Sequence, residues 1–210
     1  VEVDPVGDDL DRFQPSADAD DGPRLTSLGV REPYVAFVGT LEPRKDVPSL
    51  VRAFDRVAGA HPDLQLVLAG SEAWGAKAVD AAVGAAAHSD RIVRTGYVDD
   101  STVPALLRRA AAVAYPSLEE GFGLPALEAL ACGTPLVTTT GSAMEEVAGG
   151  AAVLVEPGDA DGLAGVLDML VRGDAGVDAR RQRGLAVAAR HTWESCAGAH
   201  VAVYRSVARG

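Results

Sequence analysis

The chain has 210 residues, of which 48% are hydrophobic and 23% are charged, a composition that allows a buried core and predicts one globular domain. Its 30 acidic residues outnumber its 19 Lys and Arg residues, and the net charge of −11 argues against general binding of nucleic acid or of an anionic membrane surface. The sequence has two cysteines without metal-type spacing, no signal peptide and no apolar run of about 18 residues, which together favour a reduced, cytoplasmic setting.

The first 33 residues differ in composition from the rest. They contain seven aspartates and several Pro and Gly residues, with little hydrophobic periodicity. We predict a linker-like acidic segment over residues 1–33 and a folded domain over residues 34–210. Because the sequence does not begin with Met, we expect a piece of a longer protein.

From residue 34 onward, short apolar runs alternate with helical patterns. The apolar runs predict buried strands at residues 34–38, 64–69, 91–95, 111–115, 136–139 and 152–155. Apolar spacing of the helical type predicts helices at residues 47–60, 76–87 and 101–110, from Leu124 onward, and then at 160–171, 178–189 and 193–208. Ser101 is the expected cap of its helix. This alternation is typical of an α/β fold, a doubly wound parallel sheet of about six strands with C-terminal helices.

Four loops follow predicted strands, and ligands of such sheets bind beyond the carboxyl ends of the strands. These loops cover residues 39–46, 70–75, 96–100 and 116–123. None carries a Walker A loop or the Gly-X-Gly-X-X-Gly fingerprint, so that a P-loop NTPase and a dehydrogenase are disfavoured. The first loop offers Arg44 and Lys45, a planar fork beside a compact charge, which suits a diphosphate. A solvated basic turn is the alternative.

The fourth loop carries two carboxylates, Glu120 and Glu128, on either side of a Gly-X-Gly turn. The turn opens a helix, whose free N–H groups favour anionic or oxygen-rich ligands. This layout suits a sugar nucleotide. The alternative is that Glu120 is an ordinary loop charge and Glu128 a solvated helix residue.

Residues 116–135 resemble the E-x7-E signature of retaining, family 4 type glycosyltransferases of the GT-B fold. Residues 38–46 are similar to the phosphate loop of that family, residues 96–98 to its base-contacting turn, and residues 153–158 to a later strand. The resemblance covers about residues 34–208. Residues 3–15 look like the stretch that enters the C-terminal domain, which implies that an N-terminal acceptor-binding domain is absent from this chain.

The resemblance implies a role for each matching residue. Glu120 would contact the donor sugar, Glu128 the ribose, and Arg44 and Lys45 the diphosphate. Many family members have Arg at the position of Thr40, so this phosphate contact is expected to move to Arg44. The remaining binding residues implied by the resemblance are Gly39 and Thr40 in the phosphate loop, Tyr97 and Val98 at the base, and the backbone of Gly121, Phe122, Gly123 and Leu124.

The implied reaction moves a hexose-type sugar from a nucleoside-diphosphate donor to an acceptor. Glu120, Arg44 and Lys45 are the expected catalytic residues, and the two cations would stabilise the departing diphosphate without a metal or cofactor. The Asp-Ala-Asp runs at residues 18–20 and 159–161 are not expected to hold metal, and Asp159 should cap a helix. Nucleic acid is not an expected partner, and any membrane contact would involve the absent domain.

Two other classes of function stay open. A module that binds a nucleotide or a sugar nucleotide without chemistry has the same sequence features. A response-regulator-like interaction domain would need an acidic phospho-acceptor where the first strand ends in Gly39 and Thr40. We expect the four histidines and Cys132 to be structural and Trp74 to pack; the alternative is that Trp74 covers the site from the loop at residues 70–75. The nucleotide, the sugar and the acceptor are not specified by the sequence.

Overall fold

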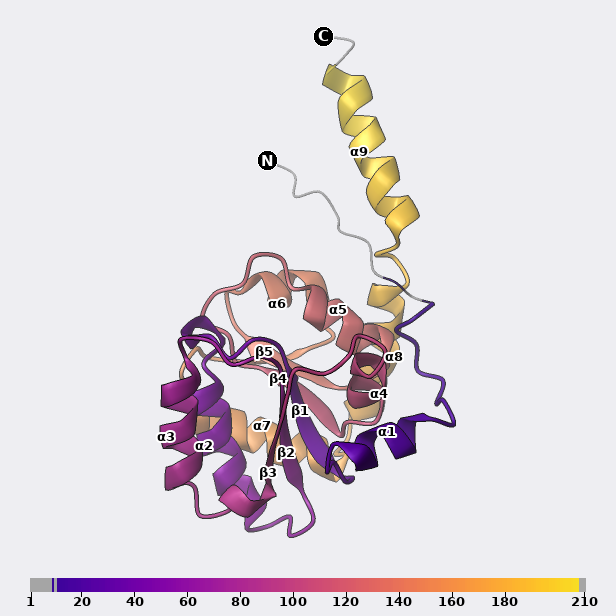
Figure 1. Cartoon of the computed structure of the whole chain (residues 1–210). Helices are drawn as coiled ribbons and strands as arrows, with labels where there is room; N and C mark the ends of the chain where they lie inside the picture. Colours follow the sequence, from indigo (N-terminus) through magenta and orange to yellow (C-terminus); the bar gives the residue numbers. More distant parts are fainter. Residues whose placement is uncertain (1–8, 10, 208–210) are drawn as a thin grey trace.

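A computed structural model describes residue 9 and residues 11–207. Within these residues, six parallel strands form a single sheet in the order β3-β2-β1-β4-β5-β6, with helices on both faces (Figure 1). The strands are β1 Tyr34–Val38, β2 Gln65–Ala69, β3 Ile92–Gly96, β4 Ala112–Tyr115, β5 Leu136–Thr139 and β6 Val153–Val155. The predicted doubly wound sheet is confirmed, and each strand lies within a residue of its predicted bounds.

The helices form two layers around this sheet. Helices α2, α3 and α7 pack together on one face, and α4, α5, α6 and α8 lie on the other (Figure 1). The helices are α1 Asp21–Ser27, α2 Val47–Ala58, α3 Ala76–Ala85, α4 Val103–Arg108, α5 Leu124–Ala131, α6 Ala143–Ala148, α7 Ala160–Arg172, α8 Val177–Ala188 and α9 Trp193–Val207, with 3-10 turns at Pro43–Lys45 and Ser89–Arg91. Helices α1 and α6 were not predicted from the sequence.

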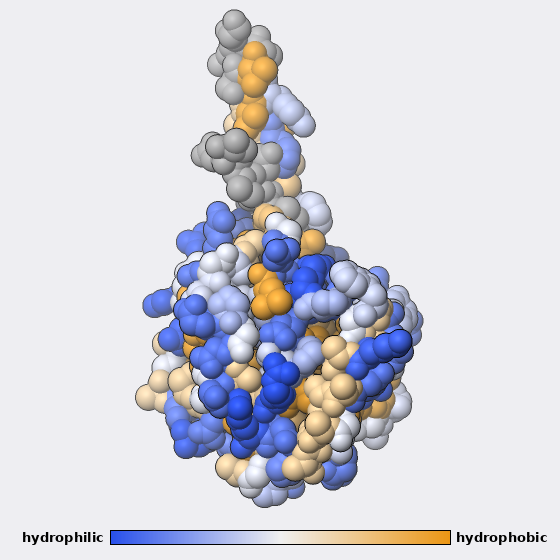
Figure 2. Space-filling model, turned by 90° about the vertical axis from the view of Figure 1, so that its left-hand side faces the viewer, coloured by the Kyte–Doolittle hydropathy of each residue, from blue (hydrophilic) through white to orange (hydrophobic). Residues whose placement is uncertain are grey.

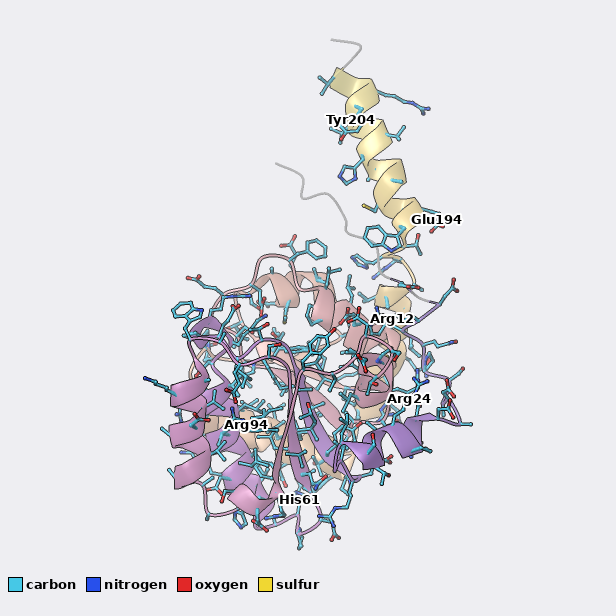
Figure 3. The ribbon with its side chains drawn as sticks, viewed as in Figure 1. Arg12, Arg24, His61, Arg94, Glu194 and Tyr204 are labelled. Carbon is cyan, nitrogen blue, oxygen red and sulfur yellow. The ribbon has the colours of Figure 1, made fainter. Side chains whose placement is uncertain are left out.

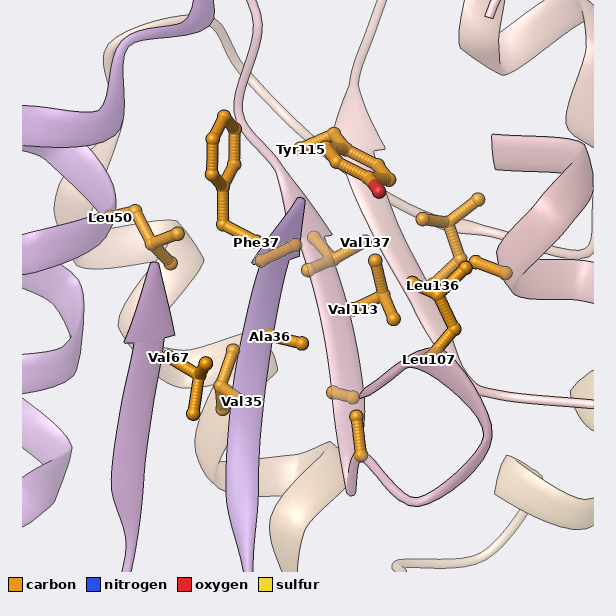
Figure 4. Close-up of a cluster of buried hydrophobic side chains, with 14 of the residues drawn as sticks. Val35, Ala36, Phe37, Leu50, Val67, Leu107, Val113, Tyr115, Leu136 and Val137 are labelled. Carbon is orange, nitrogen blue, oxygen red and sulfur yellow. The ribbon is translucent and has the colours of Figure 1, made fainter. Parts of the chain in front are cut away.

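The core lies between the sheet and these two layers. Strand β1 is central, and its residues Val35, Ala36 and Phe37 are fully buried. Figure 4 shows them beside Val67 of β2 and Val113 of β4. Continuous apolar strands of this kind require cover on both faces, which the two helix layers provide.

The order in which the strands are added to the sheet reverses between β1 and β4. Strand β1 pairs with β2 on one side, where Val35 is level with Leu66, and with β4 on the other, where Val35 is level with Ala112. The crossovers from β1 run outward to β3, and those from β4 run outward to β6. The loops that leave β1 and β4 therefore diverge at a switch point, where doubly wound sheets bind ligands.

The described part of the acidic N-terminal segment packs onto this body. Phe13, Leu25 and Val30 are buried in the same hydrophobic cluster as the sheet. Asp21 is fully buried, and its two carboxylate oxygens accept hydrogen bonds from Nε and Nη2 of Arg108 on α4, both at 2.8 Å. The segment with linker-like composition therefore packs onto the body through these buried side chains, whereas residues 14–20 are exposed. Most of the predicted domain-entry stretch, residues 3–15, lies at or beyond the edge of the described residues.

The last helix leaves the body. Helix α9 projects from the end of α8 (Figure 1), and its side chains Glu194 and Tyr204 stand clear of the sheet (Figure 3). Figure 2 shows hydrophobic residues along this projecting helix, where Val201, Val203 and Val207 are exposed. Its predicted end at residue 208 lies outside the described residues. Among the residues that the structure describes, no helix is long and apolar enough to cross a membrane.

Candidate functional site

The four predicted loops lie together at the carboxyl edge of the sheet, toward which the arrowheads in Figure 4 point. Backbone hydrogen bonds join neighbouring loops to one another. The amide of Leu118 donates to the carbonyl of Arg44 at 2.7 Å, and the amide of Leu41 donates to the carbonyl of Ser71 at 3.0 Å. The loops after β1 and β4 therefore form one surface at the switch point.

Two glycines allow this close packing. Gly75 lies against the loop after β1, since a Cβ atom on it would stand 2.7 Å from the carbonyl oxygen of Leu41. Gly123 has a positive φ of 104° and begins helix α5, and a Cβ atom on it would lie 2.9 Å from Cγ of Met144. A residue with a side chain would be strained at Gly123 and would clash at Gly75.

The centre of this surface is a group of charged side chains that we call the charge cluster, formed by Glu42, Arg44, Lys45 and Glu120. Arg44 donates from Nε to Oε2 of Glu42 at 2.7 Å and from Nη1 to Oε2 of Glu120 at 3.0 Å. Nζ of Lys45 donates to Oε1 of Glu120, and the hydroxyl of Ser117 donates to the same oxygen at 2.6 Å. The structure thus brings together the three residues that the sequence suggested for catalysis.

The members of the cluster differ in exposure. The side chain of Glu120 is 5% exposed and that of Lys45 is 10% exposed, whereas that of Arg44 is 42% exposed. The hydrogen bond with Glu42 raises the pKa of the Arg44 guanidinium; burial opposes this shift, and the charge of Glu120 adds to it. Buried carboxylates are tolerated only when they are paired and hydrogen-bonded, and Glu120 is both.

Sequence reasoning missed Glu42 and Ser117. Ser117 is fully buried, and its carbonyl accepts a hydrogen bond from the Thr139 hydroxyl at 2.5 Å, which ties the loop after β4 to the end of β5. Glu42 lies two positions before Arg44 in the same loop. That short spacing between opposite charges was the only signal in the sequence that could have suggested the pair.

Glu128 lies in α5 and is half-buried. Beside it, the hydroxyl of Tyr115 is buried at the end of β4 and has no hydrogen-bond partner among the described residues. Burial raises the pKa of Tyr115, and the negative charges of Glu128 and Glu120 raise it further. Both carboxylates therefore act on the carboxyl end of β4.

The remaining predicted residues line the same edge. Gly39 and Thr40 follow β1, and Tyr97 is exposed while Val98 is buried in the loop after β3. The expectation that Trp74 packs is wrong, because its side chain is 82% exposed. The backbone of the loop after β2 is bonded to the loop after β1, and the indole of Trp74 points into solvent.

His61 and His88 form ion pairs that join neighbouring helices. Nε2 of His61 lies 2.7 Å from a carboxylate oxygen of Asp168 on α7, and Nδ1 of His88 lies 2.9 Å from one of Asp55 on α2. Figure 3 shows His61 at the end of the body opposite α9. The first contact joins the end of α2 to α7, and the second joins the end of α3 to α2. Neither contact involves a residue of the charge cluster.

Other predictions concern capping and metal ligands. Asp159 accepts from the Gly162 amide at 2.9 Å, which confirms its predicted capping role. Ser101 does not cap α4, because the helix begins after Thr102, whose side chain makes no capping bond. Among residues 9 and 11–207, no three His, Cys, Asp or Glu side chains gather as a metal site would require.

The family described as "Glycosyl transferases group 1" matches residues 32–172 of the chain. This match covers more than half of the sequence and includes the charge cluster. The chain belongs to the glycosyl transferases group 1 family. The resemblance inferred from the motifs is thereby confirmed at the level of the family, and sugar transfer is confirmed as the class of activity of that family.

A curated relative within this class is O-antigen chain mannosyltransferase B of Escherichia coli, which is 32% identical over 173 residues. The match covers 82% of this chain and 45% of the relative. The chain spans about half the length of the curated relatives it matches.

Solved structures of the glycosyltransferase group show the same fold. Sucrose-phosphate synthase from Thermosynechococcus elongatus has a TM-score of 0.82 and 28% identity, over 97% of this chain and 52% of that chain. The C-terminal domain of a glycosyl transferase group 1 protein from Francisella tularensis has a TM-score of 0.74 and 25% identity, over 86% of this chain and 96% of that chain. Anabaena HepE, solved with UDP-glucose, has a TM-score of 0.80 at 20% identity, over 97% of this chain and 56% of that chain.

Proposed function

We propose that the chain is the donor-binding half of a retaining glycosyltransferase, which moves a hexose-type sugar from a nucleoside-diphosphate donor to an acceptor. The observation that carries this proposal is the charge cluster at the switch point of the sheet, where two cations and a buried carboxylate lie in front of helix α5. The E-x7-E resemblance and the family membership support the retaining outcome.

Arg44 and Lys45 are the proposed diphosphate ligands. As the bond between the sugar and the diphosphate breaks, negative charge gathers on the diphosphate. Fixed cations and the free N–H groups at the start of α5 stabilise that charge. The proposed reaction uses no metal and no cofactor, because the protein supplies the cations itself.

Glu120 is the proposed sugar ligand. Its Oε1 atom accepts hydrogen bonds from Lys45 and Ser117, and its Oε2 atom accepts one from the half-exposed Arg44. A carboxylate oxygen has two lone pairs, so Oε2 can accept a hydrogen bond from a sugar hydroxyl while it stays bonded to Arg44. We assign the ribose to Glu128, the base to Tyr97 and Val98, and the remaining phosphate contacts to the backbone of residues 39–40 and 121–124.

The acceptor is proposed to bind to a second domain that faces this surface. The close match to a C-terminal domain solved on its own supports this arrangement. The domain boundary at residue 33 is part of the same proposal. A cytoplasmic setting is also proposed, in keeping with Cys132 and Cys196, which form no disulfide within the described residues.

Calorimetric titration with UDP, GDP, their glucose and mannose conjugates and the bare nucleosides tests the proposal. We expect a nucleoside diphosphate to bind far more tightly than its nucleoside, and the isolated chain to transfer no sugar. Glu128→Ala should weaken diphosphate binding by about 1.5–3 kcal/mol, as expected for a lost hydrogen bond to a charged group. Glu120→Ala should weaken only the binding of the sugar conjugate. Equal losses for both variants with both ligands would contradict these assignments.

A non-catalytic binding module is the second candidate. The observation in its favour is the burial of Glu120 beneath its own cations, which keeps the carboxylate from solvent. Sugar transfer by the chain together with an acceptor-binding domain of a relative would exclude this candidate. Tight donor binding without transfer or donor hydrolysis in that mixture would favour it.

A further inference from the structure

Glu42 is not one of the proposed donor ligands, yet it contacts Arg44, the more exposed of the two cations of the donor site. Its side chain is 26% exposed, and its Oε2 atom accepts from Nε of Arg44 at 2.7 Å. Charge-assisted bonds of this length are the kind that a phosphate oxygen would make with the same donor.

The two carboxylates of the cluster accept hydrogen bonds from different nitrogens of the Arg44 guanidinium, so that each of its paired-donor edges includes a nitrogen that already donates. One edge consists of Nε and Nη2, and Nε donates to Glu42. The other edge consists of Nη1 and Nη2, and Nη1 donates to Glu120. Arginine binds phosphate most strongly through two parallel N–H groups. Because Nε has a single hydrogen and donates it to Glu42, a diphosphate can bind the edge of Nε and Nη2 in this way only after it displaces Glu42.

The charges of the cluster also cancel. Glu42 and Glu120 carry two negative charges, and Arg44 and Lys45 carry two positive charges. Glu120 is buried with Lys45 and stays paired, so Glu42 is the carboxylate that a ligand can displace at least cost.

We propose that Glu42 competes with the diphosphate for Arg44, an inference that rests on the proposed donor site. Glu42 thereby weakens binding of the nucleoside diphosphate and speeds release of this product. The alternative is that Glu42 orients Arg44 and so strengthens binding of the diphosphate. The Arg44 guanidinium has other contacts that orient it, since Nη1 donates to Oε2 of Glu120 at 3.0 Å and to the carbonyl of Glu119 at 3.3 Å.

The test is Glu42→Gln, which keeps the shape of the side chain and removes its charge. We expect UDP or GDP, whichever the wild-type chain binds, to bind about threefold to tenfold more tightly, the size expected for one partly screened charge. Its dissociation should slow by a similar factor in stopped-flow measurements, and binding of the bare nucleoside should not change. Glu42→Asp, whose carboxylate is one methylene shorter, should show a smaller gain.

The matched control is Glu32→Gln. Glu32 pairs with Nε of Arg109 at 2.5 Å, just before β1 at the opposite edge of the sheet. Glu32→Gln makes the same change in net charge and removes the same kind of ion pair as Glu42→Gln, but at the edge of the sheet opposite the donor site. The diphosphate affinity of Glu32→Gln should therefore equal that of the wild type. Combining Glu42→Gln with Arg44→Ala should abolish most of the gain relative to Arg44→Ala alone.

Each result separates the two proposals. Unchanged or weaker diphosphate binding by Glu42→Gln, with wild-type binding intact, overturns the role of Glu42 and leaves the donor site standing. A full gain in the Arg44→Ala background also overturns competition for Arg44. If neither the wild type nor Glu42→Gln binds any nucleoside diphosphate, the donor site and this inference both fail. Circular-dichroism melting of every variant checks that it is folded.

Discussion

At the scale of single residues, Glu120 is the side chain on which the charge cluster depends. Its carboxylate accepts from Arg44, Lys45 and Ser117 at once, and it is 5% exposed. Removal of one partner from a buried ion pair leaves an uncompensated charge, which costs more than the pair itself contributes. The residues proposed to bind the donor therefore also stabilise the fold.

Lys45→Ala tests this dependence. We expect it to lower the free energy of unfolding by about 1–3 kcal/mol, because Glu120 keeps Arg44 and Ser117 as partial compensation. Arg44→Ala, which removes a half-exposed partner, should cost less than about 1 kcal/mol. Urea unfolding followed by circular dichroism measures both. Adding Glu120→Gln should recover part of the loss in Lys45→Ala, and no recovery would contradict the buried pairing.

The sequence predicted which residues meet at the site better than it predicted how they meet. Alternating strands and helices place residues 39–46 and 116–123 at one edge of the sheet, so the proximity of Arg44, Lys45 and Glu120 followed from topology. Their pairing is a contact across 75 or 76 positions and depends on side-chain geometry that no local pattern records. For the same reason the part played by Ser117 was not predicted.

At the scale of elements, the loops after β1 and β2 are held together by backbone packing. Gly75 occupies the point of closest approach to Leu41 at the start of α3. Periodicity in the sequence predicted the flanking elements β2 and α3. It could not predict this contact between two loops, because loop residues have no periodic pattern. The sequence analysis did not predict the short helices α1 and α6, since their six or seven residues show no clear helical period. Helix α4 has six residues as well, but its apolar Val103, Leu106 and Leu107 have helical spacing.

Gly75→Ala and Gly84→Ala form a matched pair in this region. The first places a methyl group 2.7 Å from a backbone oxygen and should destabilise the protein by about 1–3 kcal/mol, as overpacking does. The second lies within α3 with no atom within 4 Å and should stabilise it by about 0.5–1 kcal/mol. Thermal melting followed by circular dichroism measures both. Equal effects of the two substitutions would contradict the close approach of the loops.

At the scale of the whole molecule, the ion pair of Asp21 with Arg108 joins the N-terminal segment to the body. Burial alone would raise the pKa of Asp21, but the hydrogen bonds from Arg108 and from the Asp18 amide, with the Arg108 charge, hold it below its usual value. A depressed carboxyl pKa stabilises the folded state above the unfolded pKa, about 3.9, and that contribution is lost as pH falls through the folded value.

Asp21→Asn should therefore destabilise the protein in a pH-dependent way. At neutral pH we expect a loss of about 3 kcal/mol, because Arg108 is left nearly buried without a counter-charge. The gap between wild type and variant should narrow as the pH is lowered below about 4, where the wild-type carboxylate becomes protonated. Urea unfolding from pH 7 to pH 3 measures it, and a gap independent of pH would show that the charge of Asp21 is not the cause.

The exposure of both tryptophans gives the molecule an unusual optical behaviour. Trp74 stands in solvent at the carboxyl edge of the sheet, and Trp193 is exposed at the base of the projecting helix α9. Indole emission in the folded protein should therefore already resemble that of the denatured chain, so fluorescence is a poor monitor of unfolding. It should instead report association, because a molecule that covers either indole would shift its emission to shorter wavelengths. Replacing each tryptophan by phenylalanine in turn would assign such a shift to the sheet edge or to α9.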